Sequence, residues 1–192
     1  MFHPIKKKPE VGIGIGIFVV EPKEAKILLG KRKEELFGLP GGWLEKFEEF
    51  EEAASRELFE ETGLKLDVKR FKHIITLNCL FLEDDYHSLS VVMYTEITDD
   101  ERDDIYNKEP SKCRGWFWDT IEKCRENHDR LFYPLRTMLD VLPELKDVKY
   151  LKKMTEKSVI WILYIKIIIF KSYLNISLLA LNLLLRIIFL LS

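Results

Sequence analysis

A short segment in the first third of the chain combines a glycine pair with a long acidic helix, and it limits the possible folds more than any other feature. Residues 48–62 contain no Pro or Gly and are rich in Glu, Ala and Leu, and Gly63 follows as a helix-ending residue. Gly41 and Gly42 permit a tight turn that brings the preceding loop against the helix. The sequence therefore predicts a loop–helix–loop unit.

The acidic side chains of this helix have the spacing of a divalent-cation site. Glu57 and Glu61 are four residues apart and share one helix face, and Glu60 flanks the same edge. Mg²⁺ prefers oxygen ligands and commonly combines one or two carboxylates with substrate phosphate oxygens. Arg56 can pair with Glu60 or reach back to Glu48, and either contact would fix the position of a carboxylate. A solvated acidic helix is the alternative interpretation.

The remaining segments predict an α/β domain. Strands are expected over five β-branched or aromatic segments: residues 11–20, 25–29, 68–82, 88–97 and 115–118. A second helix is expected over residues 130–141 with Pro134 in its first turn, and residues 99–110 are expected to form an acidic loop. The glycines at positions 12, 14 and 16 leave one strand face bare, which favours either bulges at a sheet edge or a floor beneath a substrate.

Composition excludes several classes of protein. A formal net charge of −2 argues against a partner that is a nucleic-acid polymer bound through a broad basic surface. Cys79, Cys113 and Cys124 form no CxxC pair, so we expect reduced thiols in a cytoplasmic protein rather than disulfides or structural zinc. Residues 1–10 are expected to be an N-terminal arm and residues 11–150 the folded domain.

The acidic segment also resembles a known family signature. From Gly42 to Leu64 the sequence matches the Nudix box, G-x5-E-x7-R-E-U-x-E-E-x-G-U with U a bulky aliphatic residue, at every specified position. The resemblance implies the Nudix fold, an α/β/α sandwich around a mixed sheet. It also implies cleavage of a pyrophosphate bond in a nucleotide, with Mg²⁺ as cofactor and Mn²⁺ as a substitute.

The same resemblance assigns roles to the residues of the box. Glu57, Glu60 and Glu61 would be the catalytic, metal-binding carboxylates, with Arg56 in the catalytic set and Gly41 as a further metal ligand. The general base varies within the family. Here it would be Glu61 or Glu57, or an acid outside the box: Asp84, Asp85 or Glu109.

Similarity extends beyond the box to the animal subgroup called Nudix type 15, or MutT homologue 2. The segments VGIGIGIFVV, ILLGKRK, LPGGWLE, YHSLSVVM, EPSKCRGWFW and LFYPLR, in that order, carry this resemblance over residues 11–141. It implies a homodimer that hydrolyses nucleoside and deoxynucleoside triphosphates, including oxidised guanine nucleotides, to monophosphates. Substrate contacts would come from seven residues: Arg32, Leu39, Gly41, Gly42, Phe132, Tyr133 and Leu135.

Two departures from the subgroup bear on the choice of base. Trp43 replaces a histidine and Pro134 a glycine, and proline offers no backbone N–H to a ligand. Other activities stay open, namely hydrolysis of ADP-ribose or a dinucleoside polyphosphate, and nucleotide binding without catalysis. Cys79 and Leu80 stand where ADP-ribose hydrolases commonly have a proline. The absence of that proline favours nucleoside triphosphates as the substrates.

The last part of the chain, residues 151–192, differs in composition. Residues 158–192 contain no Asp, Glu, Gly, Pro, Cys or His, and Ile and Leu make up more than half of them. A membrane anchor, a packing helix and a segment foreign to the natural domain are three open interpretations. AT-rich codons encode most of the residue types in this segment, and this favours the third interpretation. A membrane is expected as a partner only under the first.

Overall fold

A mixed β-sheet forms the centre of the domain. The computed structural model describes residues 11–32 and 35–156. Within these residues six strands form one sheet in the order β3-β2-β1-β5-β4, with β6 also pairing with β2. Only β1 and β5 pair in parallel. The strands are β1 (Gly12–Glu21), β2 (Lys26–Arg32), β3 (Phe37–Gly38), β4 (Lys72–Phe81), β5 (Tyr86–Glu96) and β6 (Cys113–Asp119).

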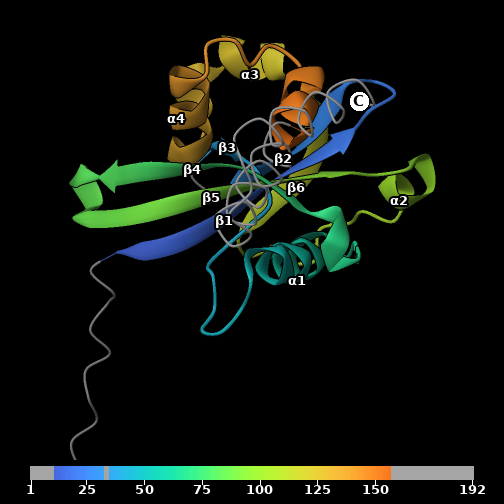
Figure 1. Ribbon diagram of the computed structural model, residues 1–192, viewed down its shortest axis with the longest axis horizontal. Coiled ribbons are helices and arrows are strands. Elements are labelled where there is room, and N and C mark those ends of the chain that lie inside the picture. Colours follow the sequence, from blue (N-terminus) through green and yellow to red (C-terminus); the bar gives the residue numbers. More distant parts are fainter. Residues whose placement is uncertain (1–10, 33–34, 157–192) are drawn as a thin grey trace, which may run out of the picture. The chain divides into compact units, whose positions relative to one another are not determined.

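Helices cover both faces of this sheet (Figure 1). On one face lies α1 (Phe50–Thr62); on the other lie α3 (Ile121–Glu126), α4 (Tyr133–Val141) and a helix over residues 148–156. The architecture is the predicted α/β sandwich around a mixed sheet.

Alternation along β1 divides the apolar core into two layers. Ile15, Ile17 and Val19 pack toward α1. Phe18 and Val20 pack toward α4. Because side chains alternate along a strand, the glycines at positions 12, 14 and 16 lie on the α4 face.

The expected boundaries of α1 are nearly correct. Glu49 is the N-cap residue and forms a capping box with Glu52, so the helix begins at Phe50 instead of at residue 48. Gly63 adopts the left-handed conformation with φ of 77° and donates its N–H to the carbonyl of Phe59. The predicted C-cap is therefore confirmed.

Local capping changes two other predictions. Residues 99–110 do not form only a loop, because Thr98 caps a short helix, α2 (Asp99–Asp103), in a capping box with Glu101. The segment predicted as a strand from residue 68 begins with a short 3₁₀-helix, Val68–Arg70, capped by the Asp67 side chain.

The helix over residues 148–156 passes the predicted domain limit at residue 150. Leu151 of this helix is fully buried in the core that α4 shares. No helix of the described residues is long and apolar enough to cross a membrane. The arm at residues 1–10 and the apolar segment 158–192 lie outside the described residues.

Candidate active site

The glycine loop before α1 runs beside β1 like an additional strand. Ile17 N–H donates to the carbonyl of Pro40 at 2.9 Å, Ile15 N–H donates to that of Gly42 at 2.7 Å, and Leu44 N–H donates to that of Ile13 at 3.0 Å. These bonds fix the loop to the centre of the sheet, so its backbone is a rigid wall of the site.

Neighbouring atoms lie so close to Gly41 and Gly42 that neither position has room for a side chain. Gly41 has φ of 144°, and a Cβ there would lie 2.0 Å from the carbonyl oxygen of Ile15. A Cβ on Gly42 would lie 2.4 Å from both carboxylate oxygens of Glu57. The glycine pair therefore lets the loop contact the sheet on one side and the Glu57 carboxylate on the other.

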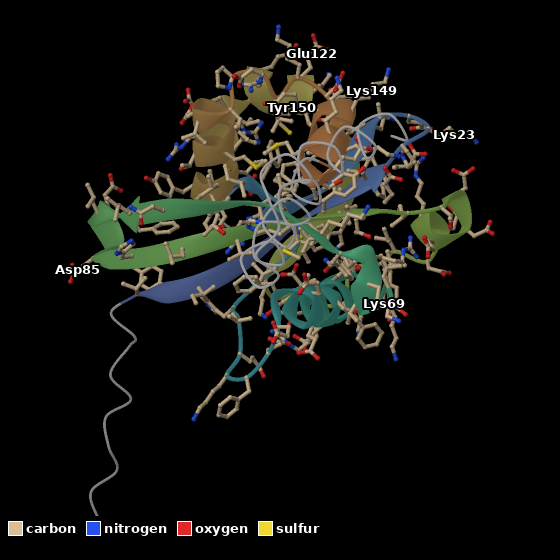
Figure 2. All side chains as sticks on the ribbon, in the orientation of Figure 1. Lys23, Lys69, Asp85, Glu122, Lys149 and Tyr150 are labelled. Atoms are coloured by element: carbon tan, nitrogen blue, oxygen red, sulfur yellow. The ribbon has the colours of Figure 1, made fainter. Side chains whose placement is uncertain are left out.

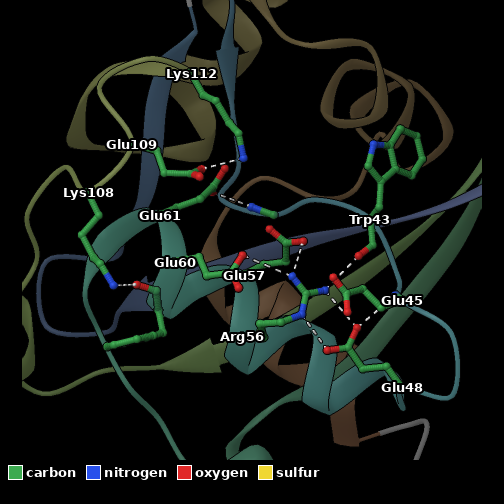
Figure 3. A network of polar contacts seen from close by, with 12 residues as sticks. Trp43, Glu45, Glu48, Arg56, Glu57, Glu60, Glu61, Lys108, Glu109 and Lys112 are labelled. Carbon is green, nitrogen blue, oxygen red and sulfur yellow. Dashed lines mark hydrogen bonds and ion pairs between the residues drawn. The ribbon is translucent and has the colours of Figure 1, made fainter.

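Arg56 organises the acidic face of α1 (Figure 3). Its guanidinium donates to both oxygens of Glu48, at 2.8 and 2.9 Å, and to Glu57 Oε1 at 2.7 Å. It also donates to the Trp43 carbonyl at 2.9 Å and lies 3.4 Å from Glu60 Oε2. Both predicted pairings of Arg56, with Glu48 and with Glu60, are present, so one side chain connects the helix to the loop.

Glu61 lies at the end of α1 beside the glycine loop and is half-buried, whereas Glu57 is buried and Glu60 is exposed. Gly41 N–H donates to its Oε2 at 2.9 Å. Burial, followed by the nearby carboxylates of Glu57 and Glu109, raises the pKa of Glu61 to about 7. The backbone carbonyl of Glu61 accepts hydrogen bonds from Lys108 N–H and from the Trp116 indole, which anchors the end of the helix.

Of the acids outside the box, the structure brings Glu109 to this site. Glu109 lies beside Glu61 and pairs with Lys112 at 2.9 Å (Figure 3). Asp85 lies instead at the exposed tip of the β4–β5 hairpin (Figure 2) and lines neither cavity of the site. For Asp84 the structure describes only the backbone.

The donor set suits a hard divalent cation. Glu57, Glu60 and Glu61 supply carboxylate oxygens to one cleft. Burial and then the charges of Glu57 and Glu109 raise the Glu61 pKa, and a bound cation would offset both effects. No three acidic, His or Cys side chains of the described residues already surround one point at metal distance. Glu57 is turned toward Arg56, and Glu61 toward the N–H of Gly41.

A second, largely apolar cavity of about 160 Å³ adjoins the acidic cleft. Five residues line both cavities: Arg32, Leu39, Gly41, Gly42 and Trp43. The floor of the apolar cavity includes Gly14 and Gly16, which agrees with the interpretation of the bare strand face as a floor. The site therefore joins an apolar chamber to an acidic one.

Most of the predicted substrate-contact residues line this apolar cavity. Leu39, Phe132 and Leu135 do so, and the guanidinium of Arg32 stacks on the Phe132 ring at 4.3 Å. Tyr133 does not line the cavity, and its ring packs against Phe81 with centroids 4.9 Å apart.

Sequence reasoning missed several lining residues, among them Phe81, Ser88 and Ser90. The serines are two residues apart and therefore share one strand face, which was a usable signal.

Comparison with known proteins agrees with this geometry. A model of the NUDIX domain matches residues 11–139. The chain belongs to the Nudix family. This Nudix chain is similar to the MutT NUDIX hydrolase from Burkholderia pseudomallei, with 25% identity and a TM-score of 0.54 over 68% of this chain and 96% of that chain. It is accordingly a Nudix hydrolase, an enzyme class that acts on nucleotides and generally uses a divalent metal.

Two further structures share the Nudix fold at lower identity. The NUDIX hydrolase from Nitrosomonas europaea is 18% identical with a TM-score of 0.57, over 71% of this chain and 90% of that chain. A bifunctional NMN adenylyltransferase/ADP ribose pyrophosphatase from Francisella tularensis, complexed with AMP and a Mn ion, is 21% identical with a TM-score of 0.54. The match covers 74% of this chain but only 43% of that one.

Proposed function

We propose that this Nudix hydrolase is a Mg²⁺-dependent nucleotide pyrophosphohydrolase that converts nucleoside or deoxynucleoside triphosphates to a monophosphate and pyrophosphate. The observation that carries the proposal is the shared wall of the two cavities. A triphosphate substrate has an aromatic end, which suits the apolar chamber, and a polyanionic end, which suits the acidic chamber once Mg²⁺ offsets the charge of its carboxylates.

The residues of the wall suit both halves of such a ligand. Arg32 lines both chambers and can bind phosphate oxygens in a bidentate manner. Leu39 and Phe132 supply apolar contacts for the base. The backbone of Gly41 and Gly42 passes between the chambers without side chains, so a phosphate chain can lie against it.

In the proposed reaction, water attacks one phosphorus atom and the bond from that phosphorus to the bridging oxygen breaks, releasing pyrophosphate. Bound Mg²⁺ supplies positive charge against the phosphate oxygens and lowers the pKa of the attacking water. Glu57, Glu60 and Glu61 would hold the cation, with Gly41 as a further ligand. Arg56 keeps Glu57 in place through its 2.7 Å contact.

The general base is assigned to one of the two carboxylates nearest the glycine wall, Glu57 or Glu61, or to Glu109. Glu57 and Glu61 line the acidic cleft, and Glu109 lies beside Glu61. Burial keeps the pKa of Glu61 near neutral pH, where proton acceptance is efficient.

The preference for triphosphates rests on the resemblance to the Nudix type 15 subgroup. That resemblance also supports oxidised or otherwise modified purine nucleotides as substrates, and a homodimer as the assembly. ADP-ribose is the second candidate, because the structurally similar Francisella chain carries an ADP ribose pyrophosphatase.

Formation of nucleotide products with Mg²⁺, followed by chromatography over a panel of nucleoside triphosphates, 8-oxo-dGTP, ADP-ribose and a dinucleoside tetraphosphate, tests the proposal. We expect the triphosphates to give the highest kcat/KM, with pyrophosphate as product. Glu61→Gln should abolish turnover while the fold is kept. Glu51→Gln is a matched control, because Glu51 lies on the same helix at a position that the box leaves unspecified. Near-normal turnover by Glu61→Gln would refute the assignment of the metal site.

A further inference from the structure

Two serine hydroxyls in the apolar cavity lack protein partners. Ser88 and Ser90 both line the cavity, and they are only 4% and 5% exposed. Neither hydroxyl has a hydrogen-bond partner among the described residues. Because both serines line the cavity, a ligand or an ordered water can supply the hydrogen bonds that the protein does not.

The sheet register explains why the Ser90 hydroxyl is accessible from the cavity. On the neighbouring strand, Ser90 pairs with Gly14 and Ser88 with Gly12. Gly14 has no side chain to cover its neighbour. The hydroxyl of Tyr86 occupies the space above Gly12, where a Cβ would lie 1.8 Å from it. Small residues on two adjacent strands thus form a flat floor with two polar groups.

The chemistry of the remaining lining limits what these hydroxyls can recognise. No Asp or Glu lies among the described residues that line this cavity, and Arg32 at its edge is the one charged side chain. A hydroxyl both donates and accepts, and it rotates to suit its partner. Strong discrimination between bases arises when the wrong base leaves a buried polar group unpaired, and a rotatable hydroxyl avoids that penalty.

We propose that Ser88 and Ser90 bind the nucleobase of the substrate through its hydrogen-bonding edge, and that the pocket accepts both adenine and guanine. This inference rests on the proposed nucleotide hydrolase function and extends it from the phosphates to the base. A hydroxyl donates to an acceptor or accepts from a donor, so the different edges of adenine and guanine are both satisfied.

Binding of AMP and GMP to the full chain, measured by calorimetry with Mg²⁺ present, tests the two serines. We expect Ser88→Ala and Ser90→Ala each to weaken binding of both monophosphates roughly threefold to tenfold. This is the effect expected from the loss of one neutral hydrogen bond. Thr95→Val is the matched control: Thr95 lies on the same strand, is buried and has an unpaired hydroxyl, but it does not line the cavity. It should change binding less than twofold. Thermal unfolding checks that each variant is folded.

Two results would overturn the inference. One is binding by both serine variants within twofold of the unmodified protein; the other is a preference of that protein for AMP or GMP above tenfold. Inorganic tripolyphosphate, which lacks a base, should bind the serine variants and the unmodified protein equally well.

The outcome separates this inference from the proposed function. If the unmodified protein hydrolyses triphosphates and the serine variants bind normally, the base assignment fails and the function stands. If no nucleotide is hydrolysed but the serine variants lose affinity for AMP, the function fails and the base assignment stands.

Discussion

Replacement of Gly42 by alanine should move the Glu57 carboxylate, a proposed metal ligand, without disturbing the backbone. The added Cβ would lie 2.4 Å from both Glu57 oxygens, and ordinary contacts begin at 3.4 Å, so the carboxylate must retreat by about 1 Å. Its 2.7 Å contact with Arg56 would be strained as well. Misplacement of a reacting group by about 1 Å costs on the order of 100-fold in rate, or about 2.7 kcal/mol. We therefore expect Gly42→Ala to lower kcat/KM about 100-fold.

Stability should respond differently from activity. Gly42 does not have a positive φ, so we expect Gly42→Ala to lower the free energy of unfolding by less than about 1 kcal/mol. Gly115→Ala is a control for the opposite behaviour, which is a loss of stability without a loss of activity. Gly115 has φ of 154° and no atom near its missing side chain, so strain should lower stability by about 1–3 kcal/mol. The folded fraction of Gly115→Ala should keep normal activity.

The assay is pyrophosphate release from the best triphosphate over a range of Mg²⁺ concentrations, with urea unfolding measured in parallel. If Gly42→Ala acts through Glu57, it should lower activity less than threefold when added to Glu57→Gln. Activity of Gly42→Ala within threefold of the unmodified enzyme would refute the argument that this glycine makes room for Glu57.

Three further predictions concern stability. Gly41→Ala combines a positive φ with a backbone clash, so it should lower the free energy of unfolding by at least about 2 kcal/mol in urea titrations, more than Gly42→Ala does. Leu151→Ala removes a fully buried side chain and should cost about 2–5 kcal/mol; a smaller loss would contradict its place in the core. Arg70 lowers the pKa of Glu101 to about 2, so their ion pair stabilises the fold above pH 4.5 and is lost as the pH falls toward 2. Since both side chains are partly exposed, Glu101→Gln should cost only about 1 kcal/mol at pH 7 and less at pH 3 in urea unfolding, whereas an equal cost at both values would argue against the pair.

The acidic helix and its glycine loop were predictable because their signals are local. The end of α1 follows from Gly63, whose left-handed conformation the sequence indicates directly. The contacts of Arg56 follow from helical spacing, which places Glu60 one turn away. The pairing with Glu48 depends on the loop folding back, which the two glycines permit.

Other parts of the site depend on packing between distant segments. The burial that raises the Glu61 pKa arises where the glycine loop and the segment around Glu109 close over the end of α1. The accessibility of Ser90 depends on its register with Gly14, about 75 residues earlier in the chain. Helix α2, in contrast, carried a local signal in the Thr98–Glu101 capping box that the prediction did not use.

Apart from the five residues that line both, the two chambers of the site draw their side chains from separate parts of the chain. Substitutions on β5 or just before α4 alter what the apolar chamber holds, whereas the carboxylates of α1 face only the other chamber. Substrate preference can therefore diverge between relatives, or be redirected by directed evolution, while one hydrolytic apparatus is inherited unchanged.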